Sequence, residues 1–134
     1  MNDKIHRILI SAGEESGDLQ GANLVTALKA ICPGLQFYGL GGKKMRQAGV
    51  ETCSDIDRMG GLGLMEFFGG FYLHWKVYRI LCREVASGRY DAVILVHYPL
   101  FNLFFARACH KAKVPVFFFI SPQIWAWRKG RIKK

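Results

Sequence analysis

A histidine and an asparagine follow an apolar run near the middle of the chain. The stretch DAVILVHYPLFN, residues 91–102, is typical of a buried strand that ends at His97, with Asn102 shortly after it. In α/β proteins, ligands bind at the loops that follow such strands. Because the ordinary pKa of histidine is about 6.5, His97 could act there as a general base. The alternative is an ordinary strand-end histidine, in a loop that carries no carboxylate.

A loop with three acidic residues follows the first apolar run. In AGEESGDLQGA, residues 12–22, Ser16 or Asp18 could cap the helix that starts there, and the free amides of that helix would favour an anionic ligand group. The alternative is a tight turn made by Gly13 and Gly17. The spacing differs from G-x-G-x-x-G, and the acidic residues would repel a pyrophosphate, so a dinucleotide site is not predicted here.

Two further loops carry basic residues. GLGGKKMRQAG, which begins at Gly39, could bring its two lysines near a phosphate, but a plain glycine turn is the favoured interpretation. ISPQIWAWRKGR, residues 120–131, is more distinctive. Its closely spaced tryptophans, Trp125 among them, could wall a pocket. Arg128 could bind a phosphate through the fork of donors on its guanidinium group.

Aromatic residues crowd the start of a long helical pattern over residues 64–87. Most aromatic stripes at helical spacing pack against a sheet. Basic residues follow closely here, so the segment could instead lie in an anionic membrane interface. The residues predicted to face that interface are Phe67, Phe68, Phe71 and Trp75.

Charge and composition limit the kind of protein. The chain has 134 residues, of which 51% are hydrophobic and 22% charged, as in a globular domain. A net charge of +9 indicates an anionic partner, which a phosphorylated substrate, a lipid surface or nucleic acid would satisfy. The four cysteines stand singly, without the C-x-x-C spacing of zinc or redox sites, so no metal is expected. No apolar run reaches the length of about 18 residues that a spanning helix needs.

Apolar runs alternate with helical patterns along the chain. Strands are predicted over residues 5–11, 35–40, 50–54, 93–96 and 114–120, and helices over residues 17–31, 43–48 and 64–87. Alternation of this kind implies right-handed crossovers and a parallel sheet. We therefore predict an α/β fold with a Rossmann-like, doubly wound parallel sheet. Its ligands would sit at the loops 12–18, 39–42, 97–102 and 121–128.

Five stretches occur in an order and spacing that span nearly the whole chain. They are GEESGDLQGA at 13–22, GLGGKKMRQAG at 39–49, GLMEF at 63–67, PLFNL at 99–103 and SPQIWAWRKGRIKK at 121–134. As an ordered set they resemble the lipid-A-disaccharide synthase family, with PLFNL matching only in part.

The resemblance implies an inverting glycosyltransferase with a glycosyltransferase-B fold. Such an enzyme joins UDP-2,3-diacylglucosamine to 2,3-diacylglucosamine 1-phosphate, forming a β-1,6-linked disaccharide and UDP. The family also implies no metal or cofactor, no nucleic-acid partner, and a homodimer in the full-length form. It implies a peripheral position on the cytoplasmic face of the inner membrane of a Gram-negative bacterium. The implied substrate-binding residues are Glu14, Ser16, Asp18, Asn102, Trp125 and Arg128, with His97 as the candidate base.

The chain departs from the family pattern in two ways. Family members are longer, so residues 1–134 are expected to form the N-terminal, acceptor-side domain, without the nucleotide-sugar domain, and to be incomplete as an enzyme. Where the family carries two aspartates, this chain has His97 and Leu100. His97 could serve as a base, but Leu100 cannot. Two other classes stay open, namely a non-catalytic module that binds anionic lipid or nucleic acid, and an inert fragment.

Overall fold

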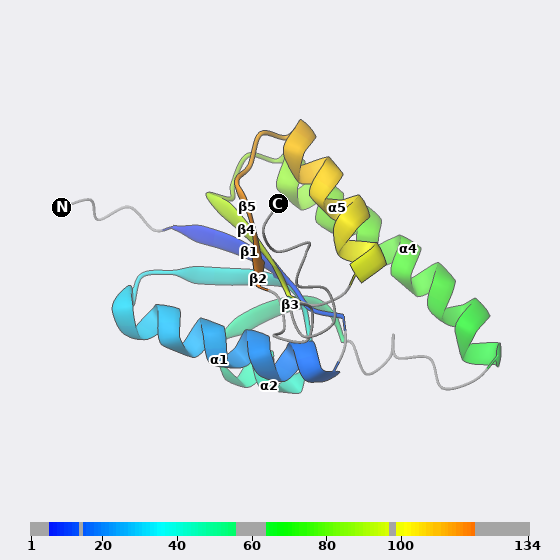
Figure 1. Cartoon of the computed structure of the whole chain (residues 1–134), viewed down its shortest axis with the longest axis horizontal. Coiled ribbons are helices and arrows are strands. Elements are labelled where there is room, and N and C mark those ends of the chain that lie inside the picture. Colours follow the sequence, from blue (N-terminus) through cyan, green and yellow to red (C-terminus); the bar gives the residue numbers. More distant parts are fainter. Residues whose placement is uncertain (1–5, 14, 56–63, 97–98, 120–134) are drawn as a thin grey trace, which may run out of the picture.

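The computed structural model describes residues 6–13, 15–55, 64–96 and 99–119. Within these ranges the chain forms a five-stranded sheet with helices on both faces (Figure 1). The strands are β1 Arg7–Ser11, β2 Gln36–Gly41, β3 Val50–Asp55, β4 Ala92–Val96 and β5 Val116–Phe119. The helices are α1 Glu15–Ile31, α2 Lys43–Gln47, α4 Leu64–Ala86 and α5 Pro99–Lys111.

The sheet has the strand order β3-β2-β1-β4-β5, and every neighbouring pair is parallel. The chain builds outward from β1 in one direction, returns to the middle, and continues from β4 in the other. The strand order therefore reverses between β1 and β4, the position at which doubly wound sheets bind their ligands. The predicted α/β fold with a Rossmann-like parallel sheet is confirmed.

Two apolar layers hold the helices to the sheet. Helices α1 and α2 cover one face and α4 and α5 the other (Figure 1). Successive residues of a strand point to opposite faces. Accordingly, Leu9 of β1 packs in a cluster with Phe105 of α5, whereas Ile10 packs with Val25 of α1 and Met45 of α2. All five side chains are fully buried, so both faces of the central strands contribute to the core.

Helix α5 was not predicted from the sequence, which suggested a loop over residues 97–102. Pro99 begins this helix, where the fixed φ of proline suits the first turn. Phe105 and Cys109, one turn apart, are both fully buried against the sheet. The loop assignment was wrong for residues 99–102, which form the first turn of α5. Asn102 is therefore presented from a helix.

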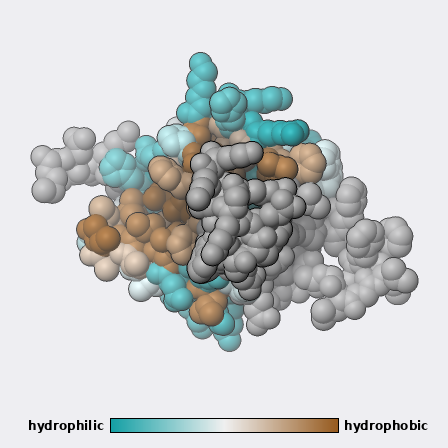
Figure 2. Space-filling model, viewed as in Figure 1, coloured by the Kyte–Doolittle hydropathy of each residue, from teal (hydrophilic) through white to brown (hydrophobic). Residues whose placement is uncertain are grey.

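Basic residues gather where α5 finishes. Figure 2 shows hydrophilic residues at this end of the molecule. His110 and Lys111 lie in the last turn of α5, and both are exposed, as is Lys113 just beyond. Part of the positive charge of the chain therefore lies at the edge of the sheet where the strands begin. Among the helices that the structure describes, none is both long and apolar enough to cross a bilayer.

Candidate functional site at the carboxyl edge of the sheet

A buried polar pair lies where β1 and β4 end. Ser11, the last residue of β1, donates a hydrogen bond from Oγ to Oδ1 of Asn102 over 3.2 Å. The Nδ2 group of Asn102 donates to the backbone carbonyl of Val96, the last residue of β4. Ser11 is fully buried and Asn102 is 4% exposed. The amide of Asn102 therefore ties the first turn of α5 to the ends of both central strands.

This pair positions the strand ends as well as stabilising them. A buried amide costs free energy unless its donor and acceptor atoms are bonded, and both atoms of the Asn102 amide have partners inside the protein. Val96 directly precedes His97 in the chain. Asn102 therefore holds Val96, the residue directly before the candidate base His97. Its predicted contact with substrate stays a prediction.

Asp18 connects α1 to the neighbouring helix. Its carboxylate accepts hydrogen bonds from the backbone amides of Gly42 at 2.8 Å, Lys44 at 3.0 Å and Met45 at 3.0 Å. The side chain is only 5% exposed. The expectation that Asp18 caps its own helix was wrong, because it lies inside α1 and caps α2 instead. A negative charge already occupies the N-terminus of α2, so Lys43 and Lys44 do not flank a free anion site there.

Glycines in β2 and α1 allow the end of β2 to pack closely against its neighbours. Gly39 has a φ of +154°, and a Cβ there would lie 1.9 Å from the carbonyl oxygen of Ile10. A Cβ at Gly41 would lie 2.6 Å from Sδ of Met45, and one at Gly21 of α1 would lie 2.9 Å from the same sulfur. The amide of Ala12 also donates to the carbonyl of Leu40 over 2.9 Å. The ends of β1 and β2 are therefore held together tightly.

The predicted site residues divide into three groups. Asp18 and Asn102 are buried, within hydrogen-bonded corners of the same sheet edge. Ser16 is exposed in the first turn of α1, beside that edge. The remaining candidates lie outside the described residues and keep the status of predictions; they are Glu14, His97, Trp125 and Arg128.

Sequence reasoning missed Ser11. Strand β1 reads RILIS: after the arginine at its start come three apolar residues, and Ser11 is the last residue. The signal for Ser11 is a hydroxyl at the last position of a central strand, and it was missed because only loop residues were considered as candidates. The partner could not be read from the sequence, because Asn102 lies 91 positions later.

The outer surface of α4 combines one aromatic side chain with basic residues. Trp75 is 54% exposed and stacks on Tyr78 with ring centroids 6.2 Å apart. Tyr78 in turn packs edge-on against Phe101, which belongs to α5. Lys76 and Arg79 are exposed beside the tryptophan, so an apolar ring and positive charge share this surface. Phe67, Phe68 and Phe71 fall within α4, but their side chains lie outside the described part.

Three of the four cysteines are poor candidates for chemistry. All four are free thiols. Burial raises the pKa of Cys53 to about 11 and that of Cys109 to about 12, and it also raises the pKa of Cys82. These three thiols stay protonated at neutral pH, and a protonated thiol is a weak nucleophile. Within the described ranges, no group of three or more His, Cys, Asp or Glu residues is placed to hold a metal ion.

The fold and this sheet edge define a class: a Rossmann-like α/β protein whose candidate site lies at the point where strand order reverses. Comparison with known proteins gives the particular family. Residues 8–134 match the family model described as lipid-A-disaccharide synthetase. The chain belongs to this family, as the ordered motifs indicated.

Curated relatives agree with the family match. The lipid-A-disaccharide synthase of Geobacter metallireducens is 46% identical over 128 residues, which cover 96% of this chain and 33% of the relative. The synthase of Geobacter sulfurreducens is 44% identical over 128 residues, with the same coverage. That of Coxiella burnetii is 44% identical over 127 residues, covering 95% of this chain and 34% of the relative. The chain thus spans about a third of the length of these relatives.

Proposed function

We propose that this chain forms the acceptor-side domain of a lipid-A-disaccharide synthase. In this proposal the whole enzyme transfers diacylglucosamine from UDP-2,3-diacylglucosamine to 2,3-diacylglucosamine 1-phosphate and releases UDP. The single observation that carries the proposal is the family match over residues 8–134. The tied ends of β1, β2 and β4 support it, because they form a rigid edge at the ligand-binding position of such a sheet.

The proposed roles follow the predicted residues. Glu14, Ser16 and Asn102 shape the acceptor pocket, and Arg128 and Trp125 contact the phosphate and the sugar. His97 takes the proton from the attacking hydroxyl, which an inverting transfer requires. Asp18 serves the pocket by holding the β2–α2 loop in place.

Acceptor binding is the first test, because it needs this chain alone. The purified chain is titrated with 2,3-diacylglucosamine 1-phosphate in detergent micelles, with the dephosphorylated lipid as the matched ligand. Stronger binding of the phosphorylated lipid supports the proposal. Equal binding of the two lipids, or none, overturns the acceptor role.

Catalysis is tested in a chimera in which residues 8–134 replace the matching third of the Geobacter metallireducens relative. The chimera should form the disaccharide, and His97→Ala should abolish transfer while leaving acceptor binding intact. His110→Ala is the control, because this exposed histidine lies at the far end of α5. Activity retained by His97→Ala would remove the base role.

We further propose that the α4 surface rests on an anionic membrane, on the cytoplasmic face of the inner membrane. The supporting observation is the exposed Trp75 beside Lys76 and Arg79, since interfacial helices combine such groups. The purified chain should sediment with vesicles of phosphatidylglycerol and much less with phosphatidylcholine. Trp75→Ala should weaken this binding about tenfold, because burying roughly half of a tryptophan ring in the membrane strengthens binding by about that factor.

Ile31→Ala provides the control for this measurement, because Ile31 is also an exposed apolar side chain, at the end of α1. A nucleic-acid module would instead lose affinity steeply with salt and would not respond to Trp75→Ala. Binding to RNA that exceeds binding to phosphatidylglycerol vesicles would contradict the membrane proposal. The homodimer that the family suggests for the longer form is testable by sedimentation of the chimera.

A further inference from the structure

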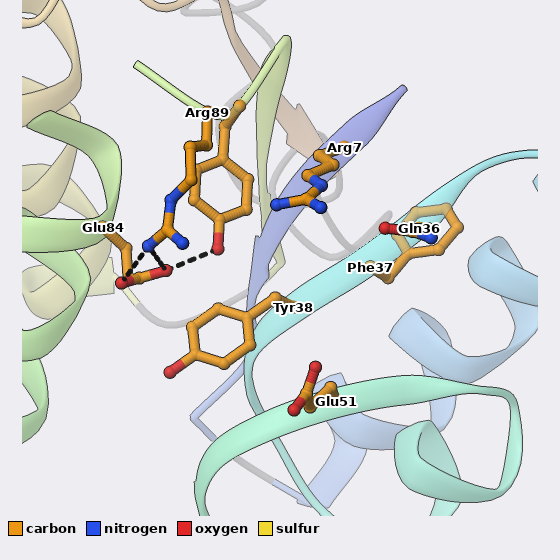
Figure 3. Close-up of a pocket in the computed structure, with 8 residues that line it drawn as sticks. Arg7, Gln36, Phe37, Tyr38, Glu51, Glu84 and Arg89 are labelled. Atoms are coloured by element: carbon orange, nitrogen blue, oxygen red, sulfur yellow. Dashed lines mark hydrogen bonds and ion pairs between the residues drawn. The ribbon is translucent and has the colours of Figure 1, made fainter. Parts of the chain in front are cut away.

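A hollow lies at the opposite edge of the sheet, where the strands begin. It encloses about 380 Å³, within the range of small-molecule sites. Arg7 and Gln36 are the first residues of β1 and β2, and Glu51 lies near the start of β3. Tyr38 of β2 lies between them, and the end of α4 closes one side (Figure 3). The hollow is thus separate from the carboxyl edge, where the proposed transfer takes place.

One wall of the hollow is held in place by hydrogen bonds. The carboxylate of Glu84, in α4, accepts two bonds from the guanidinium group of Arg89 at 2.8 and 3.0 Å. It also accepts one from the hydroxyl of Tyr90 at 2.7 Å. These three side chains satisfy one another and fix the ring of Tyr90. Its centroid lies 6.4 Å from that of Tyr38, at an interplanar angle of 32°.

The two tyrosines form a neutral aromatic surface. Burial raises the pKa of Tyr38 to about 12, and it also raises that of Tyr90, whose hydroxyl is bonded to Glu84. Both phenols therefore remain protonated at neutral pH. A flat apolar group could pack against these rings without meeting a charge on them.

Two charged side chains of opposite sign line the hollow without a partner among the described residues. The guanidinium group of Arg7 and the carboxylate of Glu51 make no hydrogen bond or ion pair in the described part of the chain. The backbone of Arg7 is fixed by its neighbour Asp91, which accepts from the Arg7 amide at 3.0 Å. In Figure 3 the Arg7 guanidinium lies on one side of Tyr38 and the Glu51 carboxylate on the other.

We propose that this hollow binds a small zwitterion with a planar apolar group, of the aromatic amino-acid class. The anionic group pairs with Arg7, the ammonium group pairs with Glu51, and the ring packs on Tyr38 and Tyr90. A purely anionic ligand fits less well, because Glu84 and Arg89 already neutralise each other and such a ligand would pair with Arg7 but leave the Glu51 carboxylate facing a second anion. Arg7, Gln36 and Glu51 are exposed, so the bound ligand stays half-solvated and its Kd is about 1 mM.

The test is a titration of the isotopically labelled chain followed by amide chemical shifts. L-Phenylalanine should give saturable shifts at Arg7, Tyr38, Glu51 and Tyr90. Three analogues each lack one group: 3-phenylpropanoate lacks the ammonium, 2-phenylethylamine the carboxylate, and L-alanine the ring. Each should bind about fivefold more weakly than phenylalanine, because the lost exposed ion pair or ring contact changes the Kd by about that factor.

Two variants separate the contributions of the charges. Arg7→Gln should weaken phenylalanine and phenylpropanoate about fivefold and leave phenylethylamine unchanged, and Glu51→Gln should show the converse pattern. Arg107→Gln, an exposed arginine of α5 outside the hollow, should change none of them.

Three results would overturn the proposal. The first is an absence of saturable shifts up to the solubility limit of phenylalanine. The second is equal binding of phenylalanine and its three analogues. The third is tighter binding of adenosine 5′-monophosphate, which would identify an anion site. Each of these outcomes is independent of whether the chain binds the acceptor lipid.

Discussion

At the carboxyl edge of the sheet, Asp18, Ser11 and Asn102 are buried and bonded to the backbone or to each other. At the amino edge, Arg7 and Glu51 are exposed and keep their charged groups unpaired within the described part of the chain. Polar groups at the first edge therefore hold loops in place, and those at the second are available to a ligand. Substitutions at the first edge should cost stability, and those at the second should affect only binding.

The largest loss of stability is expected for Gly39→Ala. Its Cβ would meet the carbonyl oxygen of Ile10 at 1.9 Å, and the backbone has a φ of +154° that a side chain disfavours. The free energy of unfolding should fall by at least about 3 kcal/mol, measured by urea denaturation. Gly34→Ala is the matched control, because no atom lies within 4 Å of its added Cβ. A small loss at Gly39 would show that the edge relaxes more easily than its packing indicates.

Asp18→Ala comes next. It leaves the amides of Gly42, Lys44 and Met45 without their acceptor in a buried corner. The unfolding free energy should fall by about 3 kcal/mol, since hydrogen bonds to a charged group are among the stronger ones. Asp18→Asn keeps one acceptor oxygen and should recover part of this loss. If alanine and asparagine were equally destabilising, the carboxylate would not act as a helix cap.

Asn102→Ala should have an intermediate effect. It removes the partner of the Ser11 hydroxyl and of the Val96 carbonyl, for an expected loss of about 2 kcal/mol. Ser11→Ala should cost less, because only one hydrogen bond is lost. The double variant, compared with the two single ones in a thermodynamic cycle, isolates the coupling between them. Full additivity would contradict a shared network.

The smallest effects are expected at the amino edge. Arg7→Gln and Glu51→Gln should each change the unfolding free energy by less than about 0.5 kcal/mol, because exposed, unpaired charges contribute little. The same urea denaturation checks this, so the two edges are compared on one scale. A loss as large as that of Asn102→Ala would erase the distinction between them.

Several elements could be predicted from the sequence because their signals are local. The continuous apolar run over residues 93–96 indicated a buried strand, and β4 lies inside the sheet, between β1 and β5. The helix over residues 17–31 was expected after the glycine-containing loop, and α1 covers Glu15–Ile31. Helix α5 was missed because its apolar residues follow the strand almost without interruption, separated mainly by Pro99.

The sheet edge that carries the candidate site could be predicted from the sequence, but the hydrogen bonds within it could not. The rule that ligands bind beyond the carboxyl ends of strands correctly placed the first turns of α1 and α5, with Asp18 and Asn102, at one edge. The hydrogen-bond partners were not predictable, because Asp18 caps a helix that begins 25 residues later. The amino-edge hollow left no sequence signal, since Arg7, Tyr38, Glu51 and Tyr90 come from four separate segments.

By itself, the sequence determined the family, the strand–helix alternation and the parallel sheet. Motif order and apolar periodicity can be read along the sequence without knowing which residues pack against one another in the fold. Only the tertiary structure decided whether a polar side chain is bonded or free. That depends on which strand ends meet, and the strand order β3-β2-β1-β4-β5 brings together residues such as Ser11 and Asn102 that lie far apart in the chain.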